Sequence, residues 1–204
     1  MLFIYSKFKG SHWQHYTPDK RMQILQALEK KFAKKFHRPV LPVLIYPENN
    51  WNCYGMFAIS NNSQYLYIND ILLYKHEYRF HALETIIHEG RHAYQYFIIN
   101  KPKINFFNFK AKQWQKNWKG YYSSTESPTI YTMQAIERDA QKYTIKILKS
   151  IAHKYKNEKA FYATLKTNID RYEQGEILAK KQFGIFYKHK INKAINEKQN
   201  KNSI

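Results

Sequence analysis

The stretch Tyr78–Ile99, YRFHALETIIHEGRHAYQYFII, decides the fold, because one long helix accounts for its whole pattern. Apolar side chains recur at helical spacing and form a stripe that faces a core. This stripe consists of Phe80, Leu83, Ile87, Tyr94 and Phe97. A polar row runs down the same helix and consists of Glu84, His88, His92 and Gln95. Burying such a row without a ligand is costly, so the pattern predicts a buried helix with a binding role.

The segment His88-Glu89-Gly90-Arg91-His92 matches the pattern H-E-x-x-H. A spacing of four residues places both imidazoles on one helix face, where they can share a tetrahedral metal ion. The glutamate between them is turned toward the water that such a metal activates. We therefore predict one Zn²⁺ per chain, bound by His88 and His92, with Glu89 as the general base of a hydrolysis.

Two histidines leave the site one protein ligand short, because catalytic zinc sites have three protein ligands and one open position. Glu137 and Asp139 lie in a later helical pattern whose other face is apolar. We predict that Glu137 is the third ligand and that Asp139 orients a ligand imidazole. The reverse assignment and the alternative that both carboxylates are solvated helix charges stay open here.

The sequence HEGRHAYQ at 88–95, followed by Glu137-Arg138-Asp139-Ala140, resembles the zincin metallopeptidases that have a glutamate ligand. The small bacterial peptidase and toxin-like domains of this gluzincin-like type share H-E-x-R-H-x-x-Q and a later E-x-D-A. The resemblance implies an α+β, zincin-like domain with a small, mostly antiparallel sheet and a peptide or protein substrate. It also implies an edge strand, here Gln64–Ile68, that binds extended substrate by strand addition. Metzincins have a glycine and a third histidine at positions 95 and 98, so that branch is excluded.

The remaining segments predict a helix and a small sheet before the motif and further helices after it. Thr17-Pro18 begins a helix that stops before Pro39. We then expect a strand over Val40–Tyr46, a hairpin of Cys53–Ser60 and Gln64–Ile68, a helix from Ser127-Pro128 to about Tyr155, and a helix from Glu158 to about Glu173. The zincin-like domain covers residues 1–155. Residues 156–204 form a basic helical extension, packed on the same domain, whose tail from Lys188 frays.

Several further polar side chains are candidates for orienting the ligands or for contacting substrate. Arg91 can pair with a nearby carboxylate or with a carboxylate of the substrate. A tyrosine of the group Tyr121, Tyr122 and Tyr131 can stabilise an oxyanion. The selected set is Asp139, Gln95, Arg91, Glu84 and Tyr131. The aromatic and basic segment 104–118 can be a lid, a membrane-surface helix, a stacking platform for nucleic acid or a packed core stripe.

Composition describes a strongly basic folded chain. The 204 residues include 34 Lys+Arg and 15 Asp+Glu, a net charge of +19, and 17% of them are aromatic, which excludes low-complexity disorder. Residues 1–40 carry +7 and residues 141–204 carry +10, whereas residues 41–100 carry −2. The basic ends predict weak contact with nucleic acid or an anionic surface. The alternative to a peptidase is therefore a nucleic-acid or anionic-surface binding protein in which the metal is structural or absent.

Targeting signals and cysteine usage indicate which cellular compartment to expect. The single cysteine, Cys53, forbids an internal disulfide and fits a reducing compartment. The N-terminus has no apolar stretch of signal-peptide length, and no window approaches the length of a membrane span. We expect a cytoplasmic protein. Delivery out of the cell by a route that needs no signal peptide stays open as an alternative.

Overall fold

The computed structural model describes residues 3–46, 53–101 and 109–201, and the chain divides into two compact units. The first unit is Met1–Tyr94 with Tyr143–Lys166, and the second is Gln95–Lys142 with Thr167–Ile204. The divisions fall inside three continuous helices, which are α5 (Arg79–Ile99), α8 (Ala135–Ile151) and α9 (Lys159–Phe183). Each of these helices therefore contributes residues to both units.

The first unit begins with helices and is organised around α3 (Pro18–Phe36). The predicted helix start is confirmed, because the Thr17 Oγ1 accepts a hydrogen bond from the Lys20 backbone N–H at 3.2 Å. His37, in the left-handed conformation with φ 50°, ends the helix. The other short elements of this unit are α1 (Phe3–Ser6), α2 (Gly10–Trp13), α4 (Ile71–Tyr74), η1 (His76–Tyr78) and η2 (Ala152–Tyr155).

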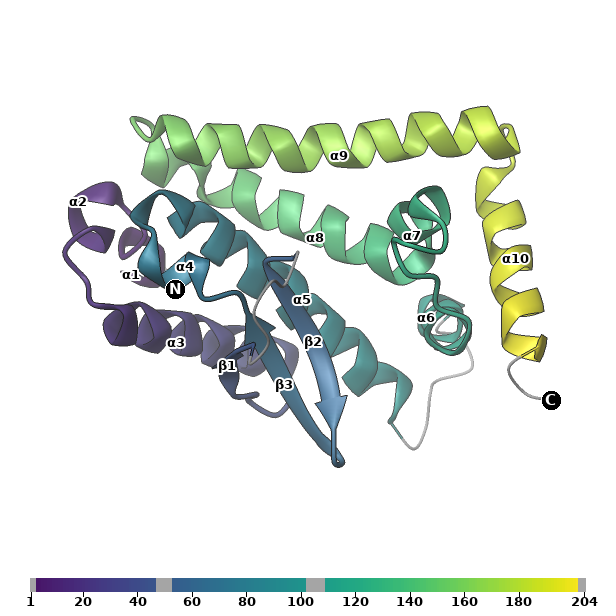
Figure 1. Cartoon of the computed structure of the whole chain (residues 1–204), viewed down its shortest axis with the longest axis horizontal. Helices are drawn as coiled ribbons and strands as arrows, with labels where there is room; N and C mark the ends of the chain where they lie inside the picture. The colour runs from purple at the N-terminus through teal and green to yellow at the C-terminus, as the bar shows by residue number, and fades with distance from the viewer. Residues whose placement is uncertain (1–2, 47–52, 102–108, 202–204) are drawn as a thin grey trace. The chain divides into compact units, whose positions relative to one another are not determined.

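The sheet of the first unit has the strand order β1-β3-β2 (Figure 1), with β1 at Val43–Ile45, β2 at Gly55–Ser60 and β3 at Ser63–Ile68. The β2–β3 hairpin is antiparallel, as its sequence predicts, and Asn61 and Asn62 take the positive φ angles that a two-residue hairpin turn requires. Strand β1 pairs with β3 in parallel, so the sheet is mixed. The expectation that Gln64–Ile68 is an edge strand is wrong, because β3 is paired on both sides.

A buried ion pair joins α3 to the segment that leads into β1. The Arg38 guanidinium donates to both carboxylate oxygens of Glu29, at 2.6 and 2.7 Å, and the Leu41 backbone N–H donates to Glu29 Oε1 at 3.0 Å. Arg38 Nη2 also donates to the backbone oxygen of Gly90 on α5, at 3.4 Å. Both charged side chains are almost completely buried. The pair therefore fixes the centre of α5 to α3 within the first unit.

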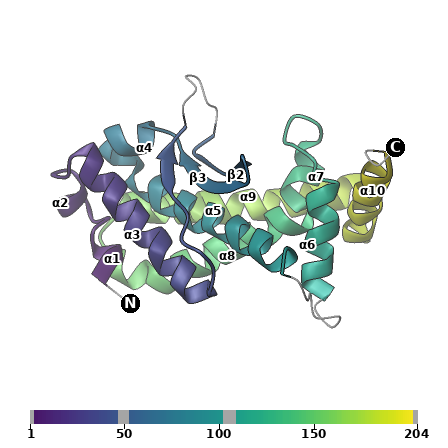
Figure 2. The ribbon, with the colours of Figure 1, turned by 90° about the horizontal axis from the view of Figure 1, so that it is seen from below.

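The second unit has a core formed by α7 (Pro128–Met133), the later part of α9 and α10 (Tyr187–Lys201), with α6 (Phe109–Lys119) packed against α10 (Figure 2). The buried members of this core are Ile130, Met133, Ala179, Tyr187, Ile191 and Ile195. The expectation that the tail frays from Lys188 is wrong as far as Lys201. Ile191 and Ile195 form a stripe at helical spacing, and their burial offsets the low apolar content of the helix.

Two other predicted helices differ from the structure in their bounds. The helix that starts at Ser127-Pro128 is interrupted at Gln134, whose extended backbone separates α7 from α8. The helix predicted to end near Glu173 continues as α9 to Phe183.

The aromatic and basic segment 104–118 is described only from Phe109 onward, and residues 102–108, with Phe107 of its predicted stripe, lie outside the described part. Ala111 and Trp114 are buried, as a packed stripe requires. Among the described residues, none of the helices combines the length and the apolarity that crossing a bilayer requires.

The buried Glu29–Arg38 pair yields a stability prediction. We expect Glu29→Gln to lower the free energy of unfolding by about 3–5 kcal/mol, because it leaves the Arg38 charge buried without its counter-charge. The double variant Glu29→Leu with Arg38→Met removes both charges, and we expect it to recover most of that loss. Urea unfolding of both proteins measures this. A single variant as stable as the unmodified protein would contradict the buried pair.

Candidate active site

The two histidines of α5 face one another across one helical turn. His88 Nε2 and His92 Nε2 lie 3.1 Å apart, and His92 is 7% exposed. Two nitrogens bound to one tetrahedral Zn²⁺ at its usual bond length stand about 3.3 Å apart. The imidazoles thus have the spacing that a shared metal ion imposes, as the i, i+4 pattern predicts.

Glu89, between the histidines, points toward the sheet of the first unit. The Phe57 backbone N–H of β2 donates to Glu89 Oε2 at 2.7 Å. The close approach of β2 to α5 depends on Gly55, since a Cβ there would lie 2.1 Å from the Thr85 methyl carbon and 3.3 Å from Glu89 Cγ. Strand β2, at one edge of the sheet, therefore holds the carboxylate of the predicted general base through its backbone.

Glu137 lies in the first turn of α8 and is buried, at 6% exposure. The Tyr121 hydroxyl donates to Glu137 Oε1 at 2.8 Å. The ring of Tyr131 packs edge-on against the ring of Tyr121, with centroids 6.1 Å apart. A buried carboxylate that a tyrosine hydroxyl orients has the environment of a metal ligand with a supporting partner.

A buried polar network fixes the segment between α6 and α8. Asn117 Nδ2 donates to Gln134 Oε1 at 2.8 Å, and Gln134 Nε2 donates to the Tyr122 backbone oxygen at 2.9 Å. The Ile136 backbone N–H donates to Asn117 Oδ1 at 2.9 Å. These bonds explain why the helix breaks at Gln134, because they hold its buried amide in place and tie the start of α8 to α6.

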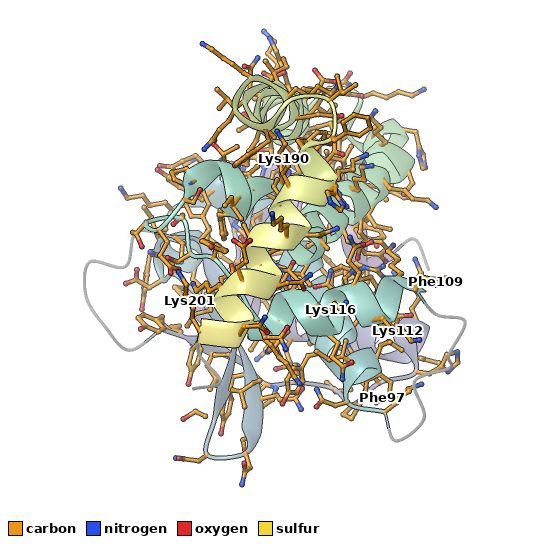
Figure 3. All side chains as sticks on the ribbon, turned by 90° about the vertical axis from the view of Figure 1, so that its right-hand side faces the viewer. Phe97, Phe109, Lys112, Lys116, Lys190 and Lys201 are labelled. Carbon is orange, nitrogen blue, oxygen red and sulfur yellow. The ribbon has the colours of Figure 1, made fainter. Side chains whose placement is uncertain are left out.

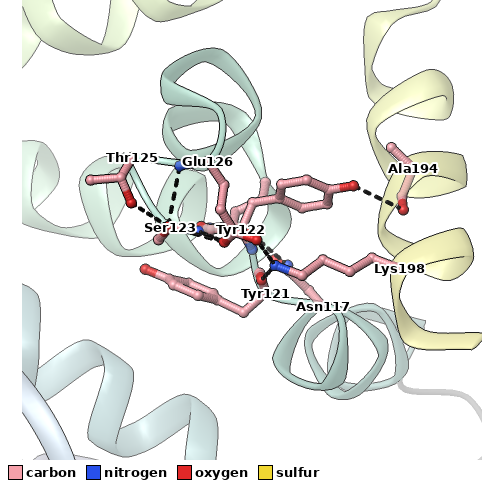
Figure 4. Close-up of polar contacts among 9 residues, drawn as sticks. Asn117, Tyr121, Tyr122, Ser123, Thr125, Glu126, Ala194 and Lys198 are labelled. Atoms are coloured by element: carbon pink, nitrogen blue, oxygen red, sulfur yellow. Dashed lines mark hydrogen bonds and ion pairs between the residues drawn. The ribbon is translucent and has the colours of Figure 1, made fainter. Parts of the chain in front are cut away.

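Lys198 of α10 also holds the segment between α6 and α8 in place (Figure 4). Its ammonium donates to the Tyr121 backbone oxygen at 2.6 Å and forms an ion pair with Glu126. The hydrogen bond from Lys198, with others from Ser123, lowers the pKa of Glu126 to about 2. The Tyr122 hydroxyl donates to the Ala194 backbone oxygen at 3.5 Å. Helix α10 thus supports the backbone that presents the Tyr121 hydroxyl to Glu137.

Gln95 connects α5 to the beginning of α8. It is completely buried, and its Nε2 donates to the Ile136 backbone oxygen and to Asp139 Oδ2, each at 3.0 Å. Lys110 of α6 forms an ion pair with the other oxygen of Asp139. Asp139, predicted to orient an imidazole, therefore holds Gln95, which lies on the same helix face as the two histidines.

The three predicted ligand residues form one group that could hold a metal ion. One nitrogen from each of His88 and His92 and one carboxylate oxygen of Glu137 lie within 4.8 Å of one another. The donor set, two imidazoles and a carboxylate, is the set that hydrolytic zinc sites use.

Two other selected residues lie on α5 in surroundings that the sequence does not reveal. The Arg91 guanidinium is 9% exposed and lies over the rings of Tyr94, Tyr143 and Phe36, at 4.7, 4.9 and 5.5 Å. Burial raises the pKa of Tyr143 to about 12, although the Arg91 charge opposes this shift. Glu84 Oε2 lies 3.5 Å from His81 Nδ1. Arg91 thus packs into an aromatic cluster of the first unit.

Sequence reasoning missed the residues that support the site through backbone or loop contacts. Phe57 acts through its amide, for which no side-chain signal exists. The sequence analysis selects Tyr131 from three tyrosines, whereas the structure shows the Tyr121 hydroxyl bonded to Glu137. Gln134 lies directly before the predicted ligand helix, but its sequence does not distinguish a buried amide from an exposed one.

Comparison with family models, with curated proteins and with solved structures finds no match for this chain.

The two glycines near the motif give opposite stability predictions. We expect Gly55→Ala to lower the free energy of unfolding by about 1–3 kcal/mol, because its Cβ overlaps the Thr85 side chain. Gly90→Ala places its Cβ at ordinary contact distance from Arg38 and Glu29, so the better helix former stabilises the protein by about 0.5–1 kcal/mol. Thermal unfolding of both variants tests this. Equal shifts of the two in one direction would refute the close approach of β2 to α5.

Proposed function

We propose that this chain is a zinc-dependent peptidase of the zincin type, in which His88, His92 and Glu137 bind one Zn²⁺ and Glu89 is the general base. One observation carries the proposal: the His88 and His92 nitrogens lie 3.1 Å apart, within 4.8 Å of a buried Glu137 oxygen. The H-E-x-x-H spacing in the sequence supports the same conclusion.

The surroundings of these three residues support a bound cation. His92 and Glu137 are both less than a tenth exposed, as the ligands of an enclosed metal ion would be. Bound Zn²⁺ supplies Lewis-acid chemistry, polarising a peptide carbonyl and lowering the pKa of a water to about 7. A site with three protein ligands leaves room for the peptide carbonyl and the water. A structural site with four protein ligands leaves no such room.

The Glu89 carboxylate removes a proton from the attacking water and delivers it to the leaving amine. One of its oxygens, Oε2, accepts the Phe57 N–H, so the carboxylate is held by a rigid strand while Oε1 is available for the proton.

Strand β2 is the part of the sheet best placed to bind substrate. It lies at the edge of the sheet, and its Phe57 amide reaches the motif helix. An extended peptide that adds to β2 forms main-chain hydrogen bonds with the outward-facing groups of the strand. This arrangement brings a peptide bond toward Glu89 and uses β2 in place of the strand predicted from the sequence.

Metal binding gives the first test of the proposal. We expect one Zn²⁺ per purified chain by elemental analysis, and we expect His88→Ala to lose it. Tyr121→Phe removes the hydrogen bond to Glu137 and weakens zinc binding about 10- to 100-fold in a competition titration with a chelator. Tyr74→Phe is the matched control, since Tyr74 is 63% exposed. A chain that binds no zinc, or a His88→Ala variant that binds it as tightly, would overturn the assignment of the metal site.

Catalysis gives the second test. Glu89→Gln keeps an oxygen that accepts the Phe57 N–H but cannot take a proton, so we expect peptide hydrolysis to fall by about 10²–10⁴-fold with zinc retained. The readout is the cleavage-site profile of a proteome-derived peptide mixture, with Glu77→Gln as the control because its side chain is 58% exposed. If Glu89→Gln cleaves as fast as the unmodified protein, the mechanism is wrong.

A further inference from the structure

Helices α6 and α10 combine into the most basic surface of the second unit. Helix α6 carries four lysines and no acidic residue, and α10 carries five lysines and one glutamate. The two helices pack against one another, and Gln113 Nε2 donates to Asn192 Oδ1 across them at 3.3 Å. Figure 3 looks onto this face and shows Lys112 and Lys116 on α6 with Lys190 and Lys201 on α10.

A groove of about 510 Å³ lies along these two helices. Its lining includes Lys112, Lys116, Gln113, Asn192, Asn196 and Phe109. Phe109 is 79% exposed, an unusual state for a phenylalanine. Lys110 also borders the groove, but its ammonium is committed to Asp139. The groove thus offers cationic groups, amide groups and one open aromatic ring, all from a single unit.

We propose that this groove binds a single strand of nucleic acid through its phosphate backbone. Lysine ammonium groups attract phosphates, and the amide groups of Gln113, Asn192 and Asn196 can donate to phosphate and sugar oxygens. An exposed aromatic ring beside a basic groove is the arrangement on which unpaired bases stack, and Phe109 supplies that ring. None of these residues belongs to the proposed metal site, so either proposal can fail without the other.

Charge and shape favour this ligand over the alternatives. A bilayer is contacted by a protruding surface with apolar side chains inserted, whereas this groove is hollow and most of the residues that line it are lysine, asparagine or glutamine. A second copy of the chain would bring one set of lysines against another, which like-charge repulsion disfavours. Ile185 and Phe186 are large exposed apolar side chains, but they lie at the turn between α9 and α10 and do not line the groove.

The test uses the full chain and a fluorescent single-stranded DNA of about 20 nucleotides, long enough to cover a typical binding groove. Fluorescence anisotropy gives the affinity from about 50 to about 200 mM NaCl, a range over which phosphate contacts weaken steeply. The double variant Lys112→Gln with Lys116→Gln removes two groove charges. We expect its affinity to fall about tenfold and its log–log salt dependence to become shallower by about 1.4, since each phosphate contact on a single strand contributes about 0.7.

The matched control is Lys30→Gln with Lys34→Gln. These lysines have the same spacing on one helix, α3, are exposed, and remove the same charge from the first unit. We expect this control to change the affinity by less than about twofold. A second groove variant, Phe109→Ser, tests stacking, and we expect it to weaken binding at least about fivefold without changing the salt dependence.

Two results would overturn the proposal. One is an equal loss of affinity from the two double variants, which shows that binding follows the total charge and not the groove. The other is the absence of oligonucleotide binding, including the case in which the protein binds only vesicles that contain phosphatidylserine. Thermal unfolding of each variant establishes that the compared proteins are equally folded.

Discussion

The hydrogen bonds of Gln95 set the geometry on which the candidate site depends. A completely buried amide has to find partners, and this one finds the Ile136 backbone oxygen and the Asp139 carboxylate at the start of α8. His92 and His88 lie one and two turns before Gln95 on the same helix face. Gln95 therefore fixes the end of the motif helix to the start of α8, the helix that carries Glu137.

Local chemistry explains which parts of the fold could be predicted from the sequence. The N-cap at Thr17, the two-asparagine turn and the apolar period of α5 are local signals, and each specifies its own element. The place of β3 in the sheet is different, because β1 joins it from a distance in the sequence and in parallel. The residues of β3, Ser63–Ile68, do not indicate which strands pair with it on either side. Pairing order is a property of the whole sheet, so the edge strand could not be predicted.

The same distinction applies to the candidate site. The proposed ligand residues are detectable because metal chemistry restricts both their type and their spacing, and two imidazoles four residues apart on one helix are typical of a shared metal ion. The groups that hold them are restricted only by geometry. Phe57 contributes a backbone amide, and Gln134 contributes a buried amide whose partners, Asn117 and Tyr122, lie 17 and 12 residues away. A supporting residue of this kind is recognised only once its partners are in place.

The proposed metal site belongs to a chain with a net charge of +19, and the distribution of the charges makes cation binding feasible. Residues 41–100, which include β2 and the motif, carry −2. Charges beyond about 10 Å are largely screened at physiological salt, so the local balance decides whether a cation binds. On α6, Lys110 is neutralised by Asp139, the residue that holds Gln95, whereas Lys112 and Lys116 line the groove. This distribution of charges is compatible with both proposals, a metal ion at the motif and a strand of nucleic acid in the groove.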